Sequence, residues 1–304
     1  MEASVNNEKR EREIMKYKAI FFDWDGTAVE SREAPADKVA GLMRQLLARG
    51  VVMVIISGTT YDKIANGKLH RYFTETELEN LYLGLGRGAF HYSFKNGEPV
   101  LHEGGALRTE EKLKIHEGVF RIHQYLLEKF ALNSDIVFTR PNYCKLDLMA
   151  EHSRNGKLYL QDGEVEMLQE LLREHGIHGG LSEVMEIAEK AGDFGDMHIQ
   201  ITTDAKYLEI GPTTKSDNVD YFVNNVLKPR EIDIEASCFW GDEFSYLADG
   251  IPGSDLYMLT EETQKGHFFD VSKTSVELPK EIRPMGGGTE TFITFLKEQL
   301  SEKN

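Results

Sequence analysis

The sequence predicts an α/β protein with a doubly wound parallel-sheet core and an inserted α+β domain. Both ends of the chain alternate short apolar segments with amphipathic ones, a pattern typical of strands and helices alternating along a parallel sheet. The middle of the chain instead combines long helical patterns with pairs of strands. A length of 304 residues also exceeds that of one small domain. We therefore expect a core built from residues 1–84 and 205–304, and an insert formed by residues 85–204.

The first third of the chain predicts one strand–helix–strand unit. Lys18–Phe22 is a short apolar run, and Val51–Ile56 is apolar throughout, as expected for an inner strand of a parallel sheet. Between them, Asp37–Arg49 has apolar residues at helical spacing, and Gly50 follows as a stop signal. The crossover in such a unit is right-handed in nearly all proteins.

The last third returns to the same alternation. Three short apolar runs predict strands and two amphipathic segments predict helices, the second of which follows a glycine-rich turn. The strands are Tyr207–Ile210, Cys238–Trp240 and Leu256–Leu259, and the helices are Ser216–Leu227 and Thr289–Leu300. The turn at Gly286–Gly288 lacks the lysine and the spacing of a phosphate-binding P-loop.

The insert is expected to contain two helices, each associated with a pair of strands. Its size is that of a common small domain. The helices are Glu110–Phe130 and Val165–His175, and the strand pairs are Asp135–Thr139 with Lys145–Met149 and Val184–Ile187 with Met197–Thr202.

The composition limits the classes of partner. The formal net charge is −16, from 51 acidic residues against 35 lysines and arginines. An overall field of this sign repels nucleic acid and anionic membranes. We therefore expect no nucleic acid and no membrane as partners. A small anionic ligand stays compatible with this charge, because a local basic site or a metal outweighs the distant field.

The cysteines and the N-terminal segment predict a reducing, cytoplasmic environment. Cys144 and Cys238 lie in apolar segments, so we expect buried thiols and no disulfide framework. Met1–Lys16 is charged and has no apolar signal segment, and no apolar run approaches the length of a membrane span. Whether Asn6–Met15 is helical or disordered stays open, as does the oligomeric state.

A pair of acids follows the first predicted strand directly. In Asp23-Trp24-Asp25-Gly26-Thr27, residues two apart point to the same side of an extended chain, so Asp23 and Asp25 can face one pocket. Ligands bind at the carboxyl ends of strands in open α/β sheets. Two carboxylates at one site favour a bound cation or a shared proton. A solvated Asp-Gly turn is the simpler alternative.

Three further polar signals follow predicted strands of the core. Ser57-Gly58-Thr59 offers a hydroxyl and exposed amides to a phosphate, although an N-cap serine explains it equally well. Lys215 stands at a helix start, where a cation opposes the helix dipole. A surface lysine is the commonest alternative, but a lysine at this position would also neutralise a phosphate and a charged carboxylate together. Asp242 and Glu243 follow an aromatic strand and suit a hard cation, or simply a helix N-terminus.

The order of these signals resembles the four motifs of the haloacid dehalogenase (HAD) superfamily of phosphatases. The segment Asp23–Thr27 matches the first motif, Ser57 the second, Lys215 the third and Gly241-Asp242 the fourth. The large insert between the second and third motifs resembles the cap domain of the Cof-type (IIB) branch. That branch includes sugar-phosphate phosphatases and is similar to sucrose- and trehalose-phosphate phosphatases. The resemblance implies a Rossmann-like core and covers most of the chain.

The resemblance also implies a role for each motif. Asp23 would attack phosphorus and form an aspartyl-phosphate, and Asp25 would be the general acid and then the general base. Mg²⁺ would be the cofactor, held by Asp23, Asp242 and the backbone carbonyl of Asp25. The phosphate oxygens would be bound by Ser57, Gly58 and Lys215.

The fourth motif departs from the Cof-type pattern. That pattern has Asn and Asp where this chain has Ser245 and Tyr246, so its second acid is missing. Glu243 is the replacement that we favour as an additional metal ligand, and Asp249 and Asp255 are the alternatives.

The insert is expected to determine substrate specificity. Its polar residues near predicted strand ends and turns would contact the organic part of the substrate, although each one alone is more readily a bystander than a ligand. The predicted substrate residues are Arg140, Asn142, Lys145 and His198, and Asp147 and Gln200 lie nearby in the same pattern. A sugar or polyol phosphate is the leading substrate class.

Three alternatives remain open for the function. A phosphomutase would use the same chemistry and return the phosphoryl group to a sugar. A receiver-type signalling protein would also have acids, a hydroxyl, a lysine and Mg²⁺, but such domains are much shorter. A binding-only HAD relative is the third alternative, and the altered fourth motif, with Ser245 and Tyr246, is the reason to consider it.

Overall fold

The computed structural model describes residues 16–102, 106–154, 163–273 and 277–301. In this part of the chain, the larger sheet has eight strands in the order β12-β11-β10-β1-β2-β3-β4-β5. The strands from β12 to β3 are parallel, and β4 and β5 extend the sheet antiparallel. Their bounds are β1 Ala19–Asp23, β2 Val52–Ile56, β3 Leu81–Leu85, β4 Phe90–Lys95, β5 Glu98–Leu101, β10 Ser237–Gly241, β11 His267–Asp270 and β12 Ile282–Pro284.

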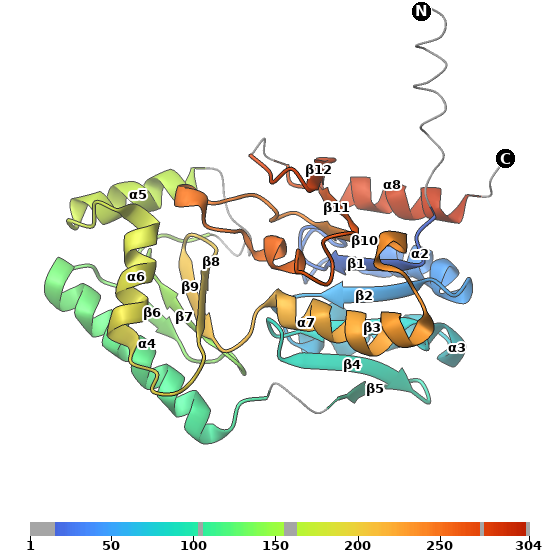
Figure 1. Cartoon of the computed structure of the whole chain (residues 1–304), viewed down its shortest axis with the longest axis horizontal. Helices are drawn as coiled ribbons and strands as arrows, with labels where there is room; N and C mark the ends of the chain where they lie inside the picture. The colour runs from blue at the N-terminus through green and yellow to red at the C-terminus, as the bar shows by residue number, and fades with distance from the viewer. Residues whose placement is uncertain (1–15, 103–105, 155–162, 274–276, 302–304) are drawn as a thin grey trace, which may run out of the picture.

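Helices cover both faces of this sheet, so the core is doubly wound (Figure 1). One face packs against α2 and α8, whose apolar sides meet Phe22, Ile55 and Trp240. The other face packs against α7 and its π-helical continuation, and buries Phe21 and Phe239. The helices are α2 Asp37–Ala48, α3 Glu75–Leu78, α7 Lys215–Phe222 followed by Val223–Leu227, and α8 Thr289–Leu300.

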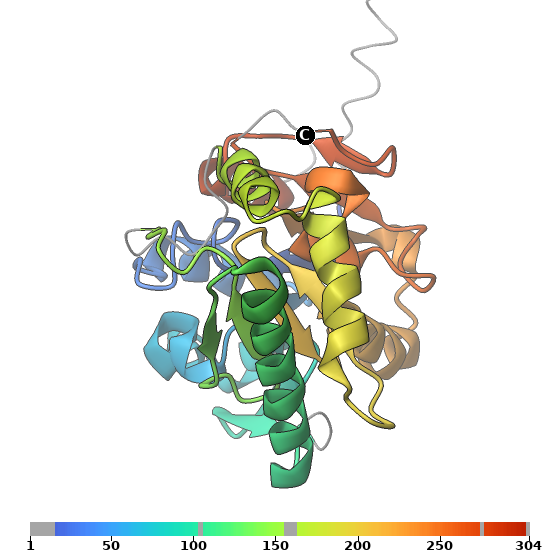
Figure 2. The same ribbon diagram turned by 90° about the vertical axis from the view of Figure 1, so that its left-hand side faces the viewer.

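The insert forms a second sheet with helices on one face. Its strands run antiparallel in the order β6-β7-β9-β8. Figure 2 shows α4 and α6 in front of this sheet, and apolar residues of both helices pack on it. The opposite face of the sheet is turned toward the core. The bounds are α4 Thr109–Phe130, β6 Asp135–Val137, β7 Cys144–Asp147, α5 Glu164–Glu174, α6 Gly180–Gly192, β8 Gln200–Thr203 and β9 Tyr207–Gly211.

The strand pairing moves both expected boundaries of the insert. Strands β4 and β5 lie beyond residue 85 but pair with β3 in the core sheet. The expected core strand Tyr207–Ile210 is part of β9, which pairs with β7 and β8 in the small sheet. The reason is a tight hairpin in which Ala205 adopts a left-handed backbone with φ +71°, so β9 folds straight back on β8. The small domain therefore runs from α4 to β9.

Two expected strands are helical. Val184–Ile187 lies within α6, because Leu181, Val184 and Ala188 are buried at helical spacing. Leu256–Leu259 overlaps a 3₁₀ helix, Ser254–Met258, and the strand next to β10 is instead β11. The other expected helices and strands lie within a few residues of their predicted bounds. The expectation for Asn6–Met15 falls outside the described residues.

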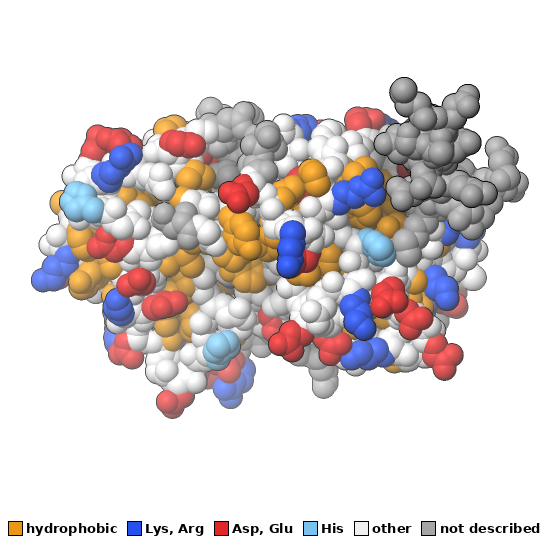
Figure 3. Space-filling model, turned by 45° about the horizontal axis from the view of Figure 1, so that its top comes forward, with side chains coloured by type: hydrophobic (Ala, Val, Ile, Leu, Met, Phe, Trp, Pro, Cys, Tyr) orange, Lys and Arg blue, Asp and Glu red, His pale blue; other side chains and the backbone are white. Residues whose placement is uncertain are grey.

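The surface carries both signs of charge. Acidic and basic side chains are interspersed over the face in Figure 3. Cys144 and Cys238 are buried free thiols, as expected. Among the described residues, no helix combines the length and the apolar character needed to cross a membrane.

Candidate active site

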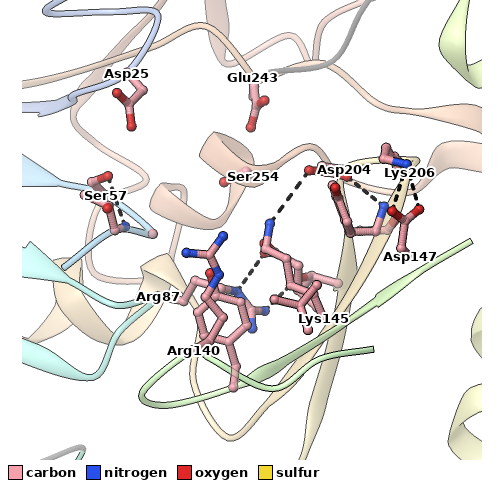
Figure 4. A pocket seen from close by; sticks show the side chains of 18 of the residues that line it. Asp25, Ser57, Arg87, Arg140, Lys145, Asp147, Asp204, Lys206, Glu243 and Ser254 are labelled. Carbon is pink, nitrogen blue, oxygen red and sulfur yellow. Dashed lines mark hydrogen bonds and ion pairs between the residues drawn. The ribbon is translucent and has the colours of Figure 1, made fainter. Parts of the chain in front are cut away.

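Three of the four predicted motifs converge because the strands that precede them, β1, β2 and β10, are neighbours in the core sheet. The remaining motif, with Lys215, follows β9 of the small sheet. β1 lies between β10 and β2, with Asp23 opposite Ile56 and Phe22 opposite Trp240. All three strands are parallel, so the segments that follow them meet at one edge. A cavity of about 540 Å³ opens there and reaches up to the small sheet. Six residues of the predicted motifs line it, namely Asp23, Asp25, Ser57, Gly58, Lys215 and Glu243. Figure 4 shows three of these, Asp25, Ser57 and Glu243, around the cavity.

Lys215 links two buried carboxylates. Its Nζ donates to Asp23 Oδ1 at 2.8 Å and to Asp255 Oδ1 at 2.7 Å. A capping box fixes the start of α7 and hence the position of this lysine, since the Thr214 N–H donates to Asp217 at 2.8 Å. Burial opposes the charge on Lys215, but Asp23 and Asp255 raise its pKa well above the usual value. The lysine is therefore a permanent cation at the floor of the cavity.

Asp255 reaches the site because the chain after β10 folds back on itself. Backbone hydrogen bonds join Gly253 to Ser245 at 2.9 Å and Asp255 to Glu243 at 3.1 Å. Asp255 Oδ2 then accepts the N–H groups of Asp242 at 3.0 Å and of Glu243 at 2.9 Å. Of the two alternatives to Glu243, Asp255 is thus brought into the site. The side chain of Asp249 lies outside the described part of the structure.

Asp242 lies under the turn that follows β1. Gly26 has φ +88°, and a Cβ there would overlap the Asp242 carboxylate. Thr27 Oγ1 donates to Asp242 Oδ1 at 3.1 Å. A glycine is therefore required both for the turn and for the close approach of this carboxylate. Together these contacts hold Asp242 against the loop that carries Asp23 and Asp25.

Asp25 is held by an arginine that the sequence did not single out. Arg32 Nη2 donates to Asp25 Oδ2 at 2.9 Å, while Asp25 Oδ1 is buried and has no partner among the described residues. Burial raises the pKa of Asp25, and Arg32 partly offsets this effect. An acid with a free oxygen and a raised pKa suits proton transfer.

The site carries an excess of negative charge. Burial raises the pKa of Asp23 and of Asp242 well above the usual value, and neighbouring carboxylates add to the effect. Burial, followed by Asp255, raises the pKa of Glu243 to about 7. Such mutual repulsion is the condition that a divalent cation relieves. In the described residues, no three His, Cys, Asp or Glu side chains form a ready cage for a metal ion. Mg²⁺ typically takes only one or two protein carboxylates.

The second motif presents its hydroxyl on a turn. Ser57 N–H donates to the Gly84 carbonyl at 2.9 Å, and Ser57 Oγ accepts the Thr59 N–H at 3.3 Å. Ser57 is not an N-cap, because the short helix that follows is capped at Thr60. Its hydroxyl hydrogen remains available to an anion in the cavity.

The small sheet supplies the upper wall of the cavity. Lys145 and Arg140, two of the predicted substrate residues, line it together with Asp147, and Lys145 pairs with Glu209 at 2.6 Å. Asn142 is buried and donates to Thr213 Oγ1 at 3.1 Å, away from the cavity lining. His198 is exposed and also lies outside the lining. The structure therefore brings together two of the four predicted substrate residues.

Several lining residues were missed from the sequence. The lining also contains Arg32, Arg87, Arg154, Lys206, Tyr207 and Glu209. For Arg87 there was a signal, because it lies inside the glycine-rich segment 84–88, between β3 and β4. Tyr207 and Glu209 were missed because the sequence analysis assigned their strand, β9, to the core.

The known proteins that this chain resembles share its fold. No family model and no curated protein matches it. An IMP-bound, N-terminally truncated IMP-nucleotidase from Plasmodium falciparum is 12% identical, with a TM-score of 0.58, over 94% of this chain and 68% of that one. The ATP-bound form of that nucleotidase is 14% identical, with a TM-score of 0.55, over 94% of this chain and 60% of that one. SMU.1108c from Streptococcus mutans UA159 is 14% identical, with a TM-score of 0.52, over 93% and 99% of the two chains. The predicted α/β fold class is thus confirmed.

Proposed function

We propose that this chain is a Mg²⁺-dependent, cytoplasmic phosphatase that hydrolyses a small phosphorylated metabolite, with sugar phosphates as the leading class. The observation that carries the proposal is the meeting of Asp23, Asp25, Ser57 and Lys215 in one cavity at the carboxyl ends of β1 and β2. These are the residues that match the HAD motifs. The shared fold with a nucleotidase supports the same reading.

Asp23 is the nucleophile of the proposed reaction. Its carboxylate oxygen attacks phosphorus, the bond to the leaving oxygen breaks, and Asp25 gives its proton to that oxygen. In the second half, a water loses a proton to Asp25, attacks the phosphorus of the aspartyl-phosphate and releases inorganic phosphate. The free oxygen of Asp25 can face the substrate while Arg32 holds the other.

The remaining residues position and neutralise the phosphoryl group. Lys215 is charged and buried beside Asp23, so it can hold a non-bridging oxygen next to the nucleophile. Ser57 Oγ and the amide of Gly58 can donate to the other oxygens. Asp23, Asp242 and the backbone carbonyl of Asp25 would hold Mg²⁺, and Glu243, predicted as an additional ligand, lines the cavity wall. The ion would supply positive charge between the nucleophile and the phosphate.

The test is a screen of phosphate esters with Mg²⁺, in which the wild type is compared with Asp23→Asn. We expect the wild type to release inorganic phosphate and the variant to fold, bind and release none. Asp196→Asn, at an exposed position of the small domain, is the matched control. Equal turnover by Asp23→Asn and the wild type would refute the role of Asp23. Stoichiometric phosphate release would separate hydrolysis from transfer to a second sugar.

A further inference from the structure

Arg87 occupies an unusual position in the loop between β3 and β4. Its φ is +54°, a left-handed backbone conformation that residues other than glycine rarely adopt. The backbone of Gly88 packs so tightly against the Thr214 carbonyl that a Cβ at Gly88 would overlap its oxygen. The loop that carries Arg87 therefore has little room to move. The arginine is nevertheless only 5% exposed and lines the cavity. A strained, buried arginine in a site is an observation that points to function.

The guanidinium of Arg87 connects the core to the small sheet and keeps one donor free. Its Nε lies 3.0 Å from Glu209, its Nη2 donates to Thr202 Oγ1 at 2.6 Å, and the group stacks on the Tyr143 ring at 4.9 Å. Nη1 is buried and has no partner in the described parts of the chain. A buried N–H without an acceptor is unfavourable unless a ligand supplies one.

Arg140 lies beside Arg87 and has the same deficiency. It comes from the loop between β6 and β7, and Figure 4 shows it next to Arg87 at the cavity. Its Nε is buried and without a partner, and it forms no ion pair with any residue that the structure describes. Two arginines that line the same cavity thus each have a buried guanidinium donor with no partner among the described residues.

The charges around these two arginines do not balance. Glu209 accepts from both Arg87 and Lys145, at 3.0 and 2.6 Å. Both cations, with Arg140 adding its field, lower the pKa of Glu209 to about 2 against the opposing effect of burial. Glu209 therefore pairs with two of the three cations at this end of the cavity. Lys145 also lies 4.0 Å from Asp204, which Arg154 shares, and Arg140 has no ion pair among the described residues. A neutral hydroxyl could occupy the free donors, but only an anion would also compensate the surplus charge.

We propose that Arg87 and Arg140 bind a second oxyanion of the substrate, a carboxylate or a second phosphate on the same molecule as the phosphoryl group that is cleaved. The inference rests on the proposed function, which places the first phosphate at Ser57 and Lys215. The planar donors of guanidinium match the oxygens of either anion. A cavity of about 540 Å³ has room for an organic group between the two ends.

The test compares three esters that share one carbon skeleton. Glucose 6-phosphate has one anionic group, while 6-phosphogluconate adds a carboxylate and glucose 1,6-bisphosphate a second phosphate. We expect kcat/KM to be about ten- to a hundredfold higher for at least one doubly anionic ester, the range of a charge-assisted contact. The two doubly anionic esters distinguish a carboxylate from a phosphate.

Two variants assign the preference to the arginines. Arg140→Gln and Arg87→Lys should each lower the ratio of kcat/KM between doubly and singly anionic esters by about tenfold. Arg140→Gln loses the positive charge, and Arg87→Lys keeps the charge but loses the planar guanidinium donors. Arg121→Gln, an exposed arginine on α4, should leave the ratio unchanged. An equal loss on all three esters would mean that the arginines only hold the fold together, and would overturn the proposal.

A binding measurement separates this inference from the proposed function. Calorimetric titration of Asp23→Asn should show tighter binding of 6-phosphogluconate or of the bisphosphate than of glucose 6-phosphate, and Arg140→Gln should remove the difference. If the wild type releases no phosphate from any ester, the proposed function fails. Tighter binding of a doubly anionic ester than of glucose 6-phosphate would still support the anion site. Hydrolysis without any preference for a second anion would refute the site alone.

Discussion

Asp255 Oδ1 accepts a hydrogen bond of 2.7 Å from Lys215 Nζ, although 40 residues separate the two in the chain. The other oxygen of Asp255 accepts the backbone N–H groups of Asp242 and Glu243. One buried carboxylate thus orients both the lysine and the loop that carries Asp242. We infer that Asp255 replaces the second acid missing from the fourth motif, and that Glu243 is a residue of the cavity wall.

Asp255→Asn should destabilise the protein by about 1–3 kcal/mol, because the amide nitrogen must face either Lys215 or a backbone N–H, and both are donors. Glu243→Gln should be neutral or stabilising, since it removes a charge that neighbouring carboxylates repel. Urea denaturation of both variants without metal measures the difference. A larger loss in Glu243→Gln than in Asp255→Asn would contradict the assignment.

Gly26→Ala should cost more stability than its backbone conformation alone explains. A side chain at φ +88° is strained, and its Cβ would also displace the Asp242 carboxylate. Gly50→Ala is the matched control, because Gly50 has φ +82° and open space around it. We expect a loss of about 1 kcal/mol for the control and clearly more for Gly26→Ala. Thermal unfolding checks this, and equal losses would show that the close approach is unimportant.

The residues that follow strands could be predicted from the sequence, because strand ends are visible in the pattern of apolar runs. Asp23, Ser57 and Asp242 belong to this class, and the parallel sheet brings them together. Asp255 could only be offered as an alternative, because its position depends on backbone hydrogen bonds within a loop. Local sequence does not encode those bonds.

Strand identity could be predicted better than sheet membership. The apolar run at β9 indicates a strand, but nothing in it tells whether the partner is β10 or β7. The hairpin at Ala205 decides the matter. Similarly, Arg87 lies in a glycine-rich loop whose direction depends on β4, a strand with half-buried residues and little apolar periodicity. The upper wall of the cavity, which the small sheet and Arg87 form, was therefore less predictable than its floor.

His91 should make stability depend on pH in the acidic range. Its ring stacks on Tyr221 at 3.7 Å, and both ring nitrogens are buried without a partner among the described residues. Burial lowers its pKa from 6.5 to about 4. Between these values the unfolded chain binds a proton that the folded protein does not, so stability falls as the pH drops from 6.5 toward 4. The loss is about 3 kcal/mol in total.

His91→Phe keeps the stacked ring and removes the titrating group. The free energy of unfolding at pH 5, relative to pH 7.5, should therefore fall less in this variant than in the wild type. His178→Gln changes an exposed histidine and should behave as the wild type does. Urea denaturation at both pH values measures the effect, and parallel curves for the wild type and His91→Phe would show that His91 does not contribute.

Mg²⁺ should invert the order of stability between the wild type and Asp242→Asn. Without metal, Asp242 is repelled by Glu243, Asp255 and Asp23, so the amide should unfold at the same temperature as the wild type or higher. With Mg²⁺, a ligand that binds only the folded state raises the melting temperature. The wild type should gain this increase and Asp242→Asn should lose most of it, whereas Asp196→Asn should keep it.

Melting curves in EDTA and in excess Mg²⁺ provide the measurement. If the melting temperature of Asp242→Asn rises with Mg²⁺ as much as that of the wild type, Asp242 is not a metal ligand. If the wild type alone gains, the cation binds where the excess negative charge of the cavity lies.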